Sequence, residues 1–120
     1  MKTLDKAAAW LLLLMGMIHA AMTFRIYKTF DLNVAWFFAT AIAIWLTAAL
    51  NLLRISYGGS VPALRWVAMI ANLLLLALDV AIATVVPLRS NPQVSVLGIL
   101  LALGIAFSLR APRTTSAGRL

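Results

Sequence analysis

Two ionisable side chains, Asp79 and His19, stand inside long apolar runs of the sequence. Asp79 follows a Leu-rich segment, and His19 is the only histidine of the chain. A charged carboxylate near the centre of a membrane-spanning helix costs about 2.5–3.5 kcal/mol unless it is paired, so such residues tend to mark functional sites or buried polar contacts. An acid and an imidazole that face one space can also transfer protons, which makes His19 and Asp79 the candidate catalytic residues.

The two side chains are expected at a similar depth. With a rise of 1.5 Å per helical residue, His19 lies about 6 Å and Asp79 about 4–5 Å outward of the centres of their runs. Thr40, in another run, falls at a similar level. This layer predicts a ligand, proton or catalytic site. The alternative, which we favour, is a structural hydrogen bond that fixes the register of the helices.

Further polar residues repeat at helical spacing. Asn33, Thr40, Thr47 and Asn51 share one face of a helix, and Asn72 and Asp79 share another. We expect both faces to point into a bundle, either as a polar path or as interhelical hydrogen bonds, and we favour the bonds. Trp45 is expected to pack on lipid, on a neighbouring helix or on an aromatic ligand, with packing favoured. The candidate ligand-binding residues are therefore His19, Thr40, Trp45, Thr47, Asn72 and Asp79.

Metal chemistry has little support in the sequence. Met15, His19 and Met22 share a helical face whose sulfur and nitrogen atoms suit copper or a haem iron. One histidine and no cysteine argue against both metals, so we expect packing by the methionines and no metal site. The cofactor is left open, with a bound lipid, quinone or pigment as the candidates.

The composition defines the class of protein. Of 120 residues, 64% are apolar and 11% charged, with a mean hydropathy of +1.02. A soluble domain has about 45–50% apolar and about 25% charged residues, so a soluble enzyme, a disordered chain and a disulfide scaffold are excluded. The net charge is +7, but the basic residues lie between apolar runs, which is typical of membrane-edge anchors and argues against nucleic acid.

Four apolar runs predict four membrane-spanning helices, because about 17–25 residues cross a hydrocarbon core. They cover residues 7–24, 34–53, 66–86 and 94–109. No good cleavage site follows the first run, so we expect a retained helix rather than a signal peptide. Short connections make neighbours antiparallel, and we predict a single all-α domain over 1–120, an up-down-up-down four-helix bundle with a mobile tail at 111–120.

The distribution of charge predicts the orientation. Seven basic residues fall at the end of the spans that holds both termini, and three fall at the other end. This bias predicts cytoplasmic N and C termini in a bacterial inner membrane. Small residues at Gly16 and Ala20, and at Gly98, Ala102 and Ala106, predict close helix approach within the chain or across an oligomer.

Three short patterns carry a resemblance. They are Gly16-x-x-His19 in the first run, Trp36–Phe38 at the start of the second and Asn51–Arg54 at its end. Together with the four-span layout they resemble the DoxX-like bacterial membrane proteins, whose functions are mostly unknown. The chain is similar to small multidrug transporters in length and helix count, but those use a membrane Glu and this chain has none.

These observations predict a non-catalytic accessory subunit of a larger membrane complex, or a binder of a small lipophilic molecule. The alternatives are a proton-coupled small transporter that uses Asp79, and an isomerase-like membrane enzyme that uses His19 and Asp79 on a lipid-like substrate. The expected partners are membrane lipids and either other transmembrane subunits or further copies of the chain.

Overall fold

The computed structural model describes residues 1–110, which form four α-helices and contain no strand. The helices are α1 (Lys2–Ile26), α2 (Leu32–Tyr57), α3 (Pro62–Ala83) and α4 (Pro92–Leu109). The all-α prediction is confirmed for this part of the chain. The predicted tail at 111–120, with Arg113 and Arg119, lies outside the described residues.

Local sequence accounts for the helix ends. The Asp31 carboxylate accepts a 3.0 Å hydrogen bond from Val34 N and caps α2. Proline begins both α3 and α4, where its missing N–H costs nothing. The third helix ends at Ala83, before the expected Val86, and the next residues bond back by their N–H groups to Ala81 O and Ile82 O.

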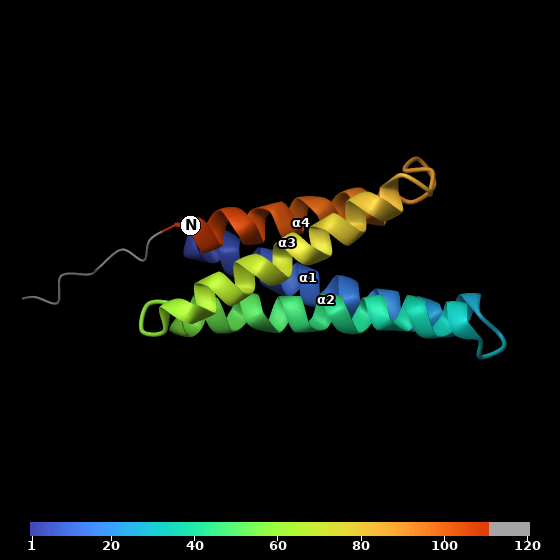
Figure 1. Cartoon of the computed structure of the whole chain (residues 1–120), viewed down its shortest axis with the longest axis horizontal. Helices are drawn as coiled ribbons and strands as arrows, with labels where there is room; N and C mark the ends of the chain where they lie inside the picture. The colour runs from blue at the N-terminus through green and yellow to red at the C-terminus, as the bar shows by residue number, and fades with distance from the viewer. Residues whose placement is uncertain (111–120) are drawn as a thin grey trace, which may run out of the picture.

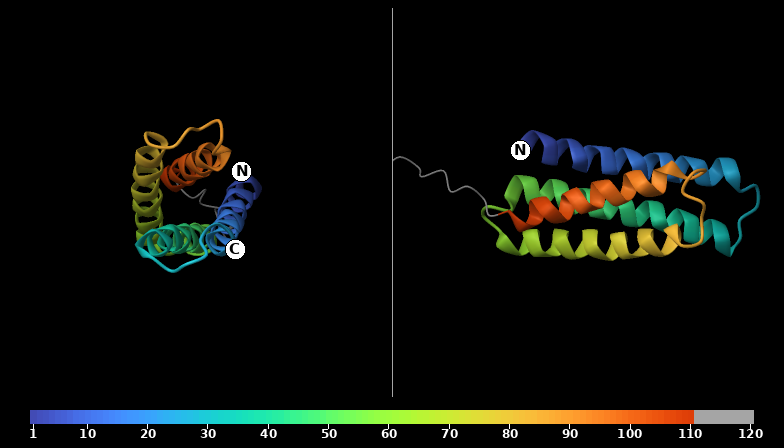
Figure 2. Two further views of the ribbon diagram at one scale, coloured as in Figure 1. Left: turned by 90° about the vertical axis from the view of Figure 1, so that its right-hand side faces the viewer. Right: turned by 90° about the horizontal axis from the view of Figure 1, so that it is seen from above.

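Consecutive helices run side by side, and their connections lie at alternating ends of the bundle (Figure 1). Each of α1 and α3 packs against both α2 and α4, so α1 and α3 occupy opposite corners (Figure 2). The α1–α2 hairpin is inclined to the α3–α4 hairpin and extends past it at the end away from Met1. This arrangement decides which of the polar residues meet.

Apolar side chains fill the interior and also cover the exterior. The core holds Leu12, Ile44, Leu75 and Leu101 among others. Large apolar side chains are also exposed on every helix, including Trp10, Leu46, Leu74 and Ile99. A helix bundle in water turns polar side chains outward. All four helices are long and apolar enough to cross a membrane.

Candidate functional site

Asp79 is buried between α3 and α4. The residue is only 5% exposed, and its Oδ2 lies where a Cβ on Gly98 would come within 3.0 Å. Glycine at position 98 therefore makes the room that the carboxylate occupies. Within residues 1–110 the carboxylate has neither a hydrogen bond nor an ion pair.

His19 lies on the diagonally opposite helix, and its ring stacks on Phe37 with centroids 4.0 Å apart. Its Nε2 is buried and has no hydrogen-bond partner in the described part of the chain. No hydrogen bond or ion pair joins His19 to Asp79 there. The acid–base pair expected at this depth is thus not assembled, because α1 and α3 do not pack together.

The two threonines of the polar stripe on α2 bond to their own helix. The hydroxyls of Thr40 and Thr47 donate to Trp36 O at 3.1 Å and to Ala43 O at 2.8 Å. Such bonds satisfy a hydroxyl in an apolar setting without any ligand. Asn33 is exposed, so the prediction that the whole stripe faces inward is wrong there. Asn33 belongs to the first turn of α2, and this turn lies where the α1–α2 hairpin extends beyond α3 and α4 (Figure 1).

Trp45 packs on α1. A Cβ on Gly16 would lie 2.6 Å from Trp45 Cδ1, so the indole fills the space that this glycine leaves. The Nε1 atom is buried without a hydrogen-bond partner among the described residues. Packing on a neighbouring helix, the favoured prediction for this residue, is what the geometry shows.

The side chains that do meet form a polar network nearer the end of the bundle that holds Met1. Asn51 on α2 and Asn72 on α3 exchange two amide hydrogen bonds of 3.1 and 3.0 Å. Asn72 also donates to Ala68 O at 2.7 Å and is fully buried. A Cβ on Gly104 would overlap the Asn72 amide, so α4 contributes only a glycine at this point.

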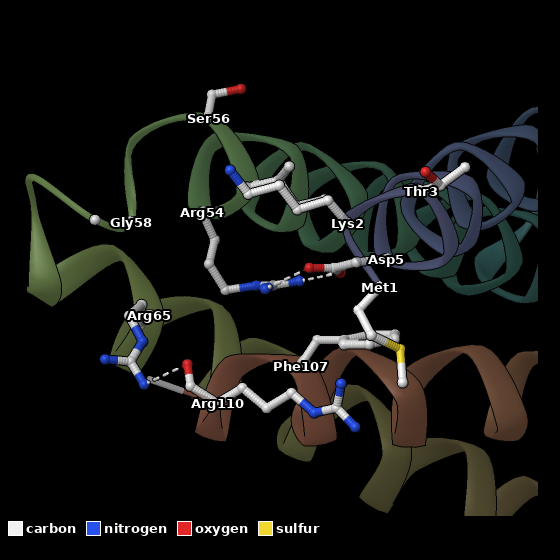
Figure 3. A pocket seen from close by; sticks show the side chains of 12 residues that line it. Met1, Lys2, Thr3, Asp5, Arg54, Ser56, Gly58, Arg65, Phe107 and Arg110 are labelled. Atoms are coloured by element: carbon white, nitrogen blue, oxygen red, sulfur yellow. Dashed lines mark hydrogen bonds and ion pairs between the residues drawn. The ribbon is translucent and has the colours of Figure 1, made fainter. Parts of the chain in front are cut away.

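An ion pair continues the network to α1. Arg54 donates to both carboxylate oxygens of Asp5, at 2.9 and 2.5 Å, and its side chain is 5% exposed (Figure 3). Arg54 also reaches Asn51 Oδ1 in a long 3.5 Å contact. The network therefore ties α1, α2 and α3 together at one end of the bundle.

Sequence reasoning missed Asp5 as a partner and read Arg54 only as a membrane-edge charge. The signal was present, because Asp5 and Arg54 are equally far along the chain from the turn at Thr29 and Phe30. Antiparallel neighbours joined by a short turn bring such positions together. A search for charge pairs symmetric about each turn would have found this one.

The arrangement is suited to holding helices together. The chain has three side-chain carboxylates and one imidazole, and no three His, Asp or Glu side chains come together within residues 1–110 to hold a metal ion. The bonded groups are amides, hydroxyls and one ion pair. The Asn51–Asn72 amides and the Asp5–Arg54 ion pair join helices and fix their register and rotation, whereas the hydroxyls bond within their own helices.

Comparison with known proteins found no similar protein. No protein-family model matches the chain, and no curated protein and no solved structure matches it either. The resemblance in layout to DoxX-like proteins therefore stays a prediction.

Proposed function

We propose that the protein crosses a bacterial inner membrane four times, up-down-up-down, with both termini in the cytoplasm. Support comes from four long apolar helices with exposed apolar side chains on each. The basic residues Lys2, Lys6, Arg54, Arg65 and Arg110 lie at the end that holds Met1, and Arg25, Lys28 and Arg89 lie at the other. Cytoplasmic ends of membrane proteins carry such an excess of Lys and Arg.

Within the membrane we infer a non-catalytic role, as a helical subunit of a larger assembly. One observation carries this proposal. The buried polar network of residues 1–110 joins helices of the same chain, through bonds of Asn51 to Asn72 and of Arg54 to Asp5. Groups bonded in this way hold helices in position, which is a structural role.

The surface for a partner helix is taken to be the small-residue face of α4. Ala102 and Ala106 are exposed there, whereas Gly98 faces Asp79 of α3 within the same chain. In a bilayer, small residues let a second helix approach closely, which favours association by van der Waals packing. The partner is another transmembrane subunit or a second copy of the chain.

Single-cysteine cross-linking tests this role, because the chain has no cysteine of its own. Ala102→Cys, labelled in native membranes with a thiol-reactive photocross-linker, should give a discrete adduct with a partner chain. Ala49→Cys is the matched control, since Ala49 is exposed on α2 at a similar distance from the same end. Adducts at both positions or at neither would contradict the proposal.

A second candidate function, a proton-coupled carrier, has one observation in its favour, the buried Asp79 carboxylate without a bonding partner in the described residues. If Asp79 has no such role, Asp79→Asn should retain assembly and growth. Its free energy of unfolding should be unchanged or raised by up to about 2 kcal/mol, because a neutral amide costs less than a carboxylate in an apolar interior. Loss of proton-driven flux in vesicles, with folding intact, would instead support the carrier and overturn the subunit role.

A further inference from the structure

A wide hollow opens at the end of the bundle that holds Met1. Its volume is about 1090 Å³, and all four helices contribute to its walls (Figure 3). The charged side chains that line it are Lys2, Asp5, Arg54, Arg65 and Arg110. We call this hollow the basic cleft.

The basic cleft carries a net charge of +3, from four cationic side chains and one carboxylate. The carboxylate, Asp5, is already bonded to Arg54. Lys2 and Arg110 are exposed, and neither side chain has a hydrogen bond within residues 1–110. The cleft therefore holds more cationic donors than the described chain uses.

Hydrogen bonds to the end of α4 hold Arg65 at the wall of the cleft. Its Nε and Nη2 donate to Ser108 O at 3.3 and 3.1 Å, and Nη2 also donates to Arg110 O at 2.8 Å. These bonds satisfy carbonyl groups at the end of α4 and fix the guanidinium at the wall of the cleft. Its Nη1 has no bond within the described chain. Guanidinium groups of this kind suit the oxygens of a phosphate.

A second hollow adjoins the basic cleft, and its lining is more apolar than that of the cleft. It shares Lys2, Thr3, Ile55 and Ser56 with the cleft, and its other lining residues are Lys6, Ala7 and Trp10. Trp10 lies about 12 Å along α1 from Lys2, toward the middle of the bundle. A small anion from solution would bind only in the cleft. An amphiphile could place its charged headgroup in the cleft and its acyl chain in the adjoining hollow.

We propose that the basic cleft binds the phosphate of one anionic phospholipid, whose acyl chain follows the adjoining hollow past Trp10. This inference rests on the proposed position of the protein in a membrane. Basic pockets at the cytoplasmic side of transmembrane helices recognise lipid headgroups in this way. The bound lipid would cover the polar network at the point where Arg54 lines the cleft.

The test is native mass spectrometry of the protein in mild detergent, titrated with phosphatidylglycerol and with phosphatidylcholine of the same chain length. The variant Lys2→Gln/Arg110→Gln removes two exposed charges that support no hydrogen bond of the described fold. The control Lys28→Gln/Arg89→Gln removes two exposed charges at the other end. Thermal unfolding of all three proteins checks that each is folded.

Wild type and control should retain one phosphatidylglycerol in preference to phosphatidylcholine, and the cleft variant should bind it about 30-fold more weakly. Equal weakening in the control, or no preference for phosphatidylglycerol, would overturn the inference. Competition by inorganic phosphate as effective as by the lipid would assign the cleft to a free anion and would also overturn it.

Membrane insertion is tested separately by alkaline carbonate washing of native membranes. Extraction of the protein by carbonate would overturn the proposed membrane position. A protein that resists carbonate but shows no selective lipid retention would overturn only the lipid site.

Discussion

Asp5→Ala should lower the free energy of unfolding by about 3 kcal/mol. Removing one partner of a buried ion pair costs about 3–5 kcal/mol, because the other charge stays buried without compensation. Here the charge left behind is the Arg54 guanidinium, whose side chain is 5% exposed. We place the effect at the lower end of the range, because Arg54 lines the basic cleft and water can reach it there.

The measurement is equilibrium unfolding in mixed micelles of mild detergent and sodium dodecyl sulfate, followed by circular dichroism. Asp31→Ala is the control, since Asp31 also interacts through its carboxylate, as the cap of α2, and such a cap is worth about 1 kcal/mol. The double variant Asp5→Leu/Arg54→Met should recover most of the loss, because it leaves neither charge buried. If Asp5→Ala lowered the free energy of unfolding no more than Asp31→Ala does, the ion pair would stabilise the fold no more than a helix cap.

Gly104→Ala should destabilise the protein by about 1–3 kcal/mol, the usual cost of overpacking. The added Cβ would come within 2.8 Å of Asn72 Cγ. Asn72 cannot turn aside without losing its bonds to Ala68 and Asn51. The better helix propensity of alanine, worth up to about 1 kcal/mol, offsets only part of this cost.

Gly98→Ala is a matched control on the same helix. Its added Cβ would meet Asp79 Oδ2 at 3.0 Å, but no hydrogen bond within residues 1–110 holds that carboxylate in place. We therefore expect Gly98→Ala to cost less than about 1 kcal/mol, measured by the same unfolding experiment. In Gly104→Ala/Asn72→Ala the steric conflict is gone, so the double variant should cost about as much as Asn72→Ala alone. Strict additivity of the two single effects would show that the methyl group and the amide do not meet.

The four helices could be predicted from the sequence because their causes are local. Apolar runs long enough to cross a membrane, prolines at the starts of α3 and α4, and glycines at the α2–α3 turn are all visible without a structure. The position of a residue along its helix axis is also determined locally, because each residue of a helix advances the chain by a constant rise. This is why His19 and Asp79 could be compared in depth.

Contacts between helices depend on which helices are neighbours and how each is rotated. His19 and Asp79 were expected in one layer, yet they stand on diagonal helices, while Asp5 and Arg54 meet across 49 positions of sequence. For α4, which is apolar on all sides, periodicity could not tell the inward face from the outward one. The predicted small-residue face has Ala102 exposed, and Gly104 is the glycine that receives Asn72.

The sequence by itself predicted four long apolar helices and the position of each polar residue along its helix. Only the tertiary structure decided that the polar network is Asp5–Arg54–Asn51–Asn72 and that a basic cleft lies beside it. The physical reason is that lipid and protein interior are about equally apolar, so hydrophobic pattern gives little information on helix rotation. Rotation is decided by close packing at glycines and by hydrogen bonds between helices, which exist only when the helices are assembled.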